Sequence, residues 1–156
     1  MFITTEIAKA HLRDPSADAA DLALKSDAAE LAAIGYLDRA VFANQAALDA
    51  AVAAVPAALI AASAAYAAAD AAADLVVGRD LILIEKAYAF DKYMLATFTA
   101  ARTRRGMVIN PVIQSAMLLL LSDLWESRED TAVGVSVASV PNGARSLLDA
   151  YRHYGA

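Results

Sequence analysis

The apolar positions of this chain recur at helical spacing along most of its length, so the pattern predicts an all-α protein. Thr4 can cap a first helix that ends near Arg13, because its hydroxyl can accept an otherwise unpaired backbone N–H. The sequence Asp14-Pro15-Ser16 then ends this helix, since proline disfavours helical geometry in the residue before it. The first predicted element is therefore a short helix.

A longer helix is predicted from Asp18, its N-cap, to about Asp38. Asp21 precedes Lys25 by four residues, which is the favourable orientation for an ion pair on a helix surface. The other side of the helix carries apolar residues at spacings of three and four: Leu24, Ala28, Leu31 and Ile34. We therefore expect an amphipathic helix.

Residues from about 44 to 106 form an alanine-rich insert that we expect to fold as a helical hairpin. Alanine has the highest helix propensity and loses no side-chain entropy on burial, so its abundance indicates helices that approach each other closely. Pro56 would cost about 3 kcal/mol inside a helix but little in a first turn. The sequence therefore predicts one helix that ends near Val55 and another from Pro56 to about Val76.

Gly78 interrupts the insert, and Asp80 is the expected cap of its next helix. We expect the buried stripe of this helix to be Leu83, Ala87, Phe90, Met94 and Phe98. The helix should end at a group of cations that lie by the negative end of the helix dipole, followed by a glycine suited to the C′ position: Arg102, Arg104, Arg105 and Gly106.

The segment from Ile109 to Asp130 opens as a helix and is apolar on nearly every side for two turns. A helix that is apolar all round must be buried on more than one face. Its neighbour can be the chain's own core or another subunit, and the sequence leaves both open. We take as a hypothesis that the subunit interface comprises Met117, Leu118, Leu120, Leu121 and Trp125, with the single tryptophan as an anchor.

The C-terminal region, residues 131–156, is predicted to dock on a partner. Residues 131–140 alternate small and β-branched side chains, which indicates a strand or a loop, and a lone strand cannot satisfy its own backbone groups. A turn over Pro141-Asn142-Gly143 leads into a short amphipathic helix from Ala144 to about Tyr151. The hypothetical docking residues are Leu147, Leu148, Tyr151 and Arg152.

Length and composition narrow the class of protein. A chain of 156 residues fits a single domain, and a net charge of −5 argues against a basic nucleic-acid-binding protein. The mean hydropathy is +0.46, and residues 50–69 carry no charge, which matches the length of a membrane-spanning helix. Most of these residues are alanine, which gains little on transfer to lipid, and Pro56 interrupts the run. We therefore expect a soluble helix and no membrane partner.

Nothing in the sequence indicates catalysis. The two histidines, His11 and His153, lie near opposite ends of the chain without an acid or a nucleophile at a motif spacing. The chain has no cysteine, no glycine-rich phosphate loop, no nucleophile elbow and no HExxH sequence. We expect no enzymatic activity, no cofactor and no metal site. The arginines at 102, 104 and 105 could contact DNA phosphates, but dipole compensation is the favoured interpretation in an acidic chain.

Four blocks of the sequence resemble the head–tail connector (head-completion adaptor) family of long-tailed bacteriophages. The first is an opening helix of the form EEAKAHLR, and the second is a long helix that ends in an aromatic residue and an arginine. The third is an apolar helix that closes like WYENRE, and the fourth is similar to LP.G…LL..YR. In this chain the blocks are residues 3–13, 18–39, 111–129 and 140–152, in the family's order. The insert from about Ala40 to Val108 is longer than in compact members of that family.

The resemblance implies a structural virion protein rather than an enzyme. Its members form a ring, here expected to be a dodecamer, beneath the portal of a DNA-filled capsid. The expected partners are further copies of the chain, the portal protein, and a tail-side neck, stopper or tail-terminator protein. Genomic DNA would pass through the lumen without sequence-specific binding, and an acidic lumen would repel it. The expected location is the virion neck, and the host cytoplasm during assembly.

The resemblance places the hypothetical contacts on two partners. Residues of the 111–129 and 18–39 helices would meet adjacent subunits, and the C-terminal residues would dock on the portal. Two other classes stay open: a small membrane-associated phage protein of the lysis type, indicated by residues 50–69, and a DNA-binding packaging factor that uses the three arginines.

Overall fold

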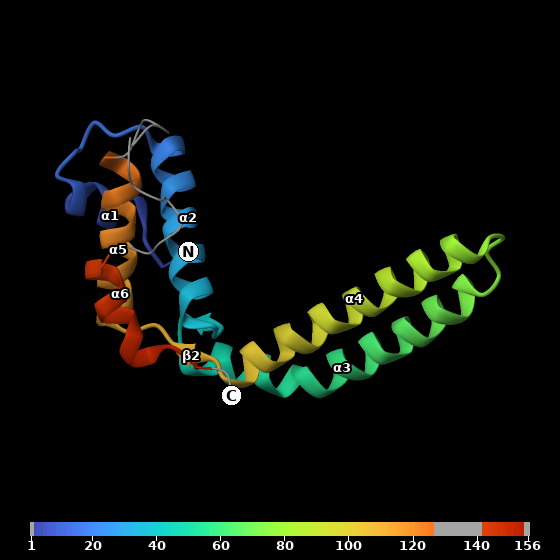
Figure 1. Ribbon diagram of the computed structural model, residues 1–156. Coiled ribbons are helices and arrows are strands. Elements are labelled where there is room, and N and C mark those ends of the chain that lie inside the picture. The colour runs from blue at the N-terminus through green and yellow to red at the C-terminus, as the bar shows by residue number, and fades with distance from the viewer. Residues whose placement is uncertain (1, 127–141, 155–156) are drawn as a thin grey trace. The chain divides into compact units, whose positions relative to one another are not determined.

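The computed structural model describes residues 2–126 and 142–154 (Figure 1). These residues are mostly helical, which confirms the predicted all-α class. The elements are α1 (Thr5–Leu12), α2 (Ala19–Leu37), β1 (Val41–Phe42), α3 (Gln45–Ala73), α4 (Arg79–Arg104), β2 (Met107–Val108), α5 (Pro111–Glu126), α6 (Asn142–Leu148) and the 3-10 helix η1 (Asp149–Tyr151). The extended segment expected over residues 131–140 lies outside the described residues.

The chain forms two compact units. The bundle unit comprises Met1–Asn44 and Met107–Ala156, and the hairpin unit comprises Gln45–Gly106. The hairpin unit therefore interrupts the bundle unit in the sequence, and each unit is built around its own helix contacts.

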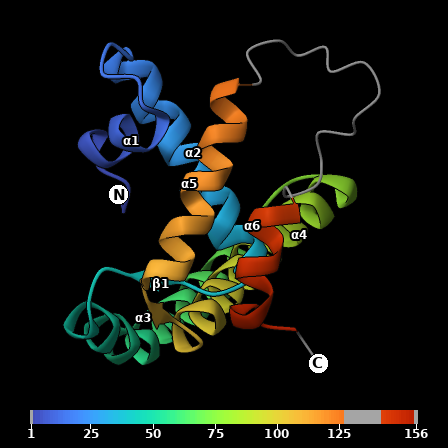
Figure 2. The same cartoon turned by 90° about the vertical axis from the view of Figure 1, so that its left-hand side faces the viewer.

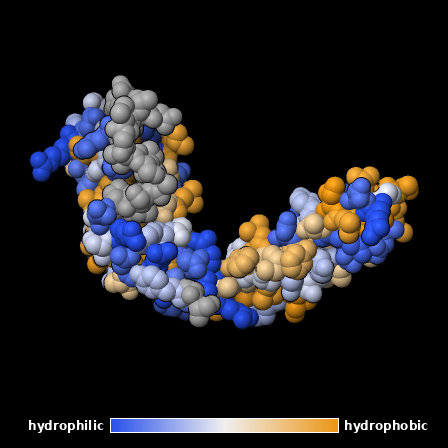
Figure 3. Space-filling view, in the orientation of Figure 1, coloured by the Kyte–Doolittle hydropathy of each residue, from blue (hydrophilic) through white to orange (hydrophobic). Residues whose placement is uncertain are grey.

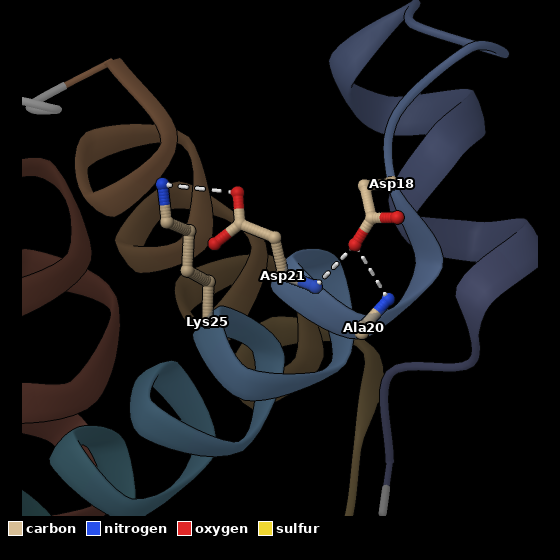
Figure 4. A network of polar contacts seen from close by, with 4 residues as sticks. All are labelled: Asp18, Ala20, Asp21 and Lys25. Carbon is tan, nitrogen blue, oxygen red and sulfur yellow. Dashed lines mark hydrogen bonds and ion pairs between the residues drawn. The ribbon is translucent and has the colours of Figure 1, made fainter.

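The first two helices begin where local capping chemistry predicts. The Thr4 hydroxyl accepts a backbone N–H one turn into α1, at 3.3 Å. One carboxylate oxygen of Asp18 accepts the N–H groups of Ala20 at 3.0 Å and Asp21 at 2.9 Å (Figure 4). The Asp21 carboxylate also lies 3.6 Å from the Lys25 ammonium. Both predicted caps and the predicted ion pair are confirmed.

Helix α5 contributes five residues to the buried cluster of the bundle unit, more than any other helix. It packs against α2 and α6 and also contacts α1 (Figure 2). Its N-terminus is capped by the Asn110 side chain, which accepts the N–H of Ile113 at 2.9 Å. The buried cluster is Ile3, Ala8, Ala17, Leu22, Ala29, Ala33, Leu37, Ile113, Ala116, Met117, Leu120, Leu121, Ala144 and Leu148. Helices from the same chain therefore cover most of the apolar residues of α5, and Leu119 stays exposed.

A buried carboxylate attaches the N-terminal segment to α2. The side chain of Glu30 is 6% exposed, and its Oε1 atom accepts the N–H groups of Phe2 and, at 2.7 Å, of Ile3. The Gln114 amide donates to the carbonyl of Phe2 at 3.1 Å from the other side. Buried N–H groups are costly without an acceptor, so Glu30 holds the completely buried Ile3 in the core.

The C-terminal turn is held against the end of α2 by polar and aromatic contacts. The Tyr36 hydroxyl donates to the Asp149 carboxylate, and the Arg152 guanidinium lies 4.5 Å from the centre of the Tyr36 ring. The N–H of His153 donates to the Leu37 carbonyl at 2.9 Å. The last described residues are thus part of the bundle unit rather than a free tail.

A small parallel β bridge closes the bundle unit where the chain leaves and returns. Val41 pairs with Met107, and Phe42 pairs with Val108. The helix-only sequence pattern does not predict this bridge, because its strands have two residues each and lie far apart in the sequence. Its role is to bring together the two ends of the inserted hairpin.

The hairpin unit consists of α3 and α4, which run antiparallel and side by side (Figure 1). Tyr66 of α3 stacks on Tyr93 of α4, with ring centres 5.4 Å apart. Near the connecting turn, the Lys86 ammonium lies 2.8 Å from the Asp74 carboxylate and 3.6 Å from that of Asp70. The hydrogen bond with Asp74 raises the pKa of Lys86. These contacts fix the register of the two helices.

Two expectations about helix ends in the hairpin are wrong. Pro56 lies inside the continuous helix α3 and does not begin a new one. Proline removes one backbone hydrogen bond, and the high helix propensity of the alanines on both sides offsets that loss. The N-cap of α4 is Gly78, with φ at 113°, and Asp80 lies within the first turn. There its negative charge interacts favourably with the positive end of the helix dipole, and no side chain makes a capping hydrogen bond.

The buried stripe predicted for α4 is also wrong. Leu83, Phe90 and Phe98 are each about half exposed, whereas the small residues Ala89 and Ala100 are buried. The distance between two packed helices depends on the side chains at their contact. Alanines on the facing sides let α3 and α4 approach closely, which leaves the larger side chains outside.

Candidate assembly surfaces

The structure places most of the hypothetical subunit-interface residues inside the bundle unit. Met117, Leu120 and Leu121 are buried in its core, and Leu118 and Trp125 are partly buried against it. A side chain that is buried by its own chain is not available to a neighbour. The hypothesis that α5 supplies the interface through these three core residues is therefore corrected, because α2 and α6 cover them.

The hypothetical docking residues are likewise engaged within the bundle unit. Leu148 is completely buried, and Leu147 and Tyr151 pack against the same core. Arg152 lies over the ring of Tyr36. The short helix after residue 141 is thus a packed part of the bundle unit, so Leu148 cannot serve as an exposed anchor, and the rest of the expected docking segment lies outside the described residues.

An apolar surface lies instead on the outer side of α2. We call it the α2 surface and define it as Leu24, Ala28 and Leu31. Leu24 and Leu31 are each 70% exposed, and Ala28 is exposed. Ile34, the fourth residue of the predicted stripe, is instead partly buried against the core. The side of α2 that enters the core is the opposite one, which carries Leu22, Ala29, Ala33 and Leu37.

The hairpin unit exposes a larger set of apolar side chains, which lie on more than one side of α4. We call it the hairpin surface and define it as Ile60, Leu75, Val77, Leu81, Leu83, Ile84, Tyr88, Phe90, Leu95 and Phe98. Apolar residues gather at the tip of the hairpin, as the space-filling view shows (Figure 3). Contiguous exposed apolar surfaces in soluble proteins mark sites that contact a protein or a membrane. Both surfaces are therefore candidates for contact with a partner.

Helix α3 is long and apolar enough to cross a membrane, by length and composition, and it is the one described helix that meets this test. Only 6% of its most apolar window is buried. Its antiparallel partner α4, however, exposes Glu85, Asp91 and Lys92. Each such charge costs about 2.5–3.5 kcal/mol at the centre of a bilayer. The paired hairpin therefore suits a protein partner better than a lipid one.

A hollow of about 560 Å³ lies beside Trp125 in the bundle unit, lined by Asp14, Ser16, Ala17, Asp18, Asp21 and Lys25. Its polar groups already serve the fold. Asp18 caps α2, Asp14 accepts hydrogen bonds from Ser16, and the Lys25 ammonium lies 4.9 Å from the Trp125 ring centre. The charged residues that line the hollow therefore already have structural partners in the bundle unit.

The basic cluster lies at the end of α4, as predicted. Arg104 is exposed, whereas Arg102 and Arg105 are partly buried and interact with other groups. The N–H of Gly106 donates to the Thr103 carbonyl at 2.9 Å and ends the helix. The cluster thus lies at the C-terminal end of the helix, where positive charges interact favourably with the negative end of the helix dipole.

One exposed histidine contact joins two helices of the bundle unit. The Nε2 atom of His11 lies 2.9 Å from the Ser122 hydroxyl, an exposed contact between α1 and α5. In residues 2–126 and 142–154, no three His, Asp or Glu side chains are grouped so that they could hold a metal ion.

Comparisons with protein-family models, curated proteins and solved structures found no match to this chain.

Proposed function

We propose that this chain is a structural subunit of the neck of a tailed bacteriophage. In this proposal it is a head–tail adaptor that forms a ring under the portal, extends the DNA channel and joins the capsid to the tail. The four-block resemblance supports the phage neck, and the two exposed apolar surfaces support assembly. The chain acts in the virion and is made in the host cytoplasm, and it needs no cofactor.

The observation that best supports a ring is the presence of two separate exposed apolar surfaces. A closed ring is built from head-to-tail contacts, in which one surface of each copy meets a different surface of the next. The α2 surface and the hairpin surface lie on different units of the chain, so one can meet the other on a neighbouring copy. The core residues of α5 then stabilise each subunit, and the exposed residues join subunits.

The acidic balance of the chain suits a DNA channel. A net charge of −5 gives a ring with strongly negative total charge, which repels the phosphate backbone and leaves DNA free to pass. The same charge disfavours a packaging factor that grips DNA, since such binding depends on many Lys and Arg contacts to phosphates. The portal and a tail-side protein are the expected partners above and below the ring.

The α2 surface provides a test in phage particles. When the Leu24→Glu/Leu31→Glu variant is the only copy of the chain, we expect DNA-filled heads and free tails that do not join. Both side chains are exposed, so the free energy of unfolding should change by no more than about 0.5 kcal/mol. The matched Leu24→Met/Leu31→Met variant keeps the surface apolar and should support joining. Normal joining with the glutamate variant would refute a role for this surface.

A further inference from the structure

The outer side of α4 carries an exposed seam with the spacing of a coiled coil. Its residues follow one another at alternating intervals of three and four: Leu81, Ile84, Tyr88, Asp91, Leu95 and Phe98. Apolar residues at the a and d positions of such heptads pack into the facing helix of a partner. The five apolar and aromatic members are between 53% and 67% exposed. Helix α3 packs on the opposite side, at Ala89 and Ala100, so the seam faces no helix of its own unit.

We propose that this seam binds the same seam of a second copy, with the two α4 helices antiparallel. In this orientation an a position of one helix lies opposite a d position of the other. The alignment that covers the whole seam puts Leu81 opposite Phe98 of the partner and Ile84 opposite Leu95 of the partner. The seam then closes with apolar layers at both ends.

The polar residues of the seam are complementary in this same alignment. Asp91, the one charged seam residue, lies opposite Tyr88 of the partner, whose hydroxyl can donate a hydrogen bond to the carboxylate. Beside the seam, Glu85 lies opposite Lys92 of the partner. Twofold symmetry repeats each pair, so the contact contains two Tyr–Asp pairs and two Glu–Lys pairs. Charges that flank a coiled-coil seam set partner choice and orientation.

A parallel pair lacks this complementarity. It would place Asp91 against Asp91 of the second copy inside the seam, and Asp80 near Glu85 of the second copy. Like charges in close contact disfavour a pairing, and a single polar seam residue is a known means of selecting orientation. The charge pattern therefore selects the antiparallel contact.

This contact differs in symmetry from the ring contact, and its test does not depend on the proposed function. A contact related by a twofold axis closes at two copies, whereas a ring needs head-to-tail contacts. The free chain is therefore a dimer through α4. Five seam residues also belong to the hairpin surface, so ring assembly replaces this contact.

Sedimentation equilibrium of the full chain tests the dimer and its charge pairs. The unchanged chain should have the mass of a dimer. The Glu85→Lys variant puts lysine opposite lysine at two symmetric places and should raise the dimer dissociation constant about four- to thirtyfold. Lys92→Glu should do the same, and the Glu85→Lys/Lys92→Glu double variant should restore the dimer. The proposal is overturned if the wild-type chain has the mass of a monomer. It is also overturned if the double variant dimerises more weakly than both single variants. The parallel arrangement predicts the opposite effect of Glu85→Lys, because lysine there would attract Asp80.

Cross-linking decides the orientation, since the chain has no cysteine of its own. Under oxidation, a mixture of the Ile84→Cys and Leu95→Cys variants should form a disulfide-linked dimer of the two variants. Each variant alone should form little, because the antiparallel alignment keeps identical positions about 16 Å apart along the helix. Efficient cross-linking of Ile84→Cys with itself would show a parallel pair and overturn the proposal.

Discussion

Replacing Leu121 with alanine is expected to lower the free energy of unfolding of the bundle unit by about 3 kcal/mol, as for other leucines in tightly packed cores. Leu121 is completely buried between helices of its own chain. The sole tryptophan, Trp125, lies in the same unit, so its fluorescence reports unfolding of that unit during a urea titration. The expected loss does not depend on protein concentration, because the contacts of Leu121 are intramolecular.

Leu119 provides the matched control on the same helix. It is 40% exposed, so its replacement by alanine should cost about 1 kcal/mol or less. Equal losses for the two variants would mean that the two sides of α5 are equally covered. A loss for Leu121→Ala that grows on dilution would mean that Leu121 contacts another subunit, and either result would contradict the assignment of α5 to the core.

The second large effect is expected at Glu30. The Glu30→Ala substitution should cost about 3 kcal/mol, because two N–H groups lose a charged acceptor and bonds to charged groups contribute about 1.5–3 kcal/mol each. Phe2 and Ile3 are the donors, so their amide hydrogens should also exchange much faster with solvent. Urea unfolding and hydrogen exchange followed by NMR measure the two effects.

The Glu30→Gln variant separates hydrogen bonding from simple loss of volume. Both N–H groups bind the same oxygen, Oε1, and a glutamine side chain keeps one such oxygen. The glutamine variant should therefore lose about 1 kcal/mol and retain slow exchange at Ile3. If alanine and glutamine gave the same small loss, the N-terminal segment would not depend on this carboxylate.

The sequence predicts the helix ends well where the chemistry is local. Thr4 and Asp18 cap their helices as expected, because a cap depends on a side chain and on backbone groups two or three residues away. Pro56 and Asp80 are the exceptions. Whether Pro56 ends a helix depends on how strongly the alanines around it favour helix. Whether Asp80 caps α4 depends on the conformation of Gly78, which begins the helix instead.

The sequence does not predict which side of a helix faces the core. In α2 and α4 the pattern identifies a stripe of apolar residues, and most of its large members are exposed, although Ile34 packs against the core. On the inner sides, alanines lie where the partner helix is close, beside Leu22 and Leu37 in α2, and this closeness is a property of the pair rather than of one helix. A signal was present in the regular recurrence of alanine, at Ala29 and Ala33 and again at Ala89 and Ala100.

Contacts between distant residues also lie beyond the sequence pattern. Glu30 meets the N-terminal segment 27 and 28 residues away, and Tyr36 meets Asp149 across 113 residues. The all-round apolar character of α5 correctly predicts burial on more than one side. It cannot tell whether the covering helices come from the same chain, and here α2 and α6 do.

Under the proposed function a tailed phage encodes this chain, and electron cryomicroscopy of the neck of that phage's particles tests the central claim most directly. We expect a closed ring of copies beneath the portal, in which neighbouring copies cover the α2 surface and the hairpin surface. A neck without this chain, a chain found in the host membrane, or a ring that leaves both surfaces exposed would contradict it.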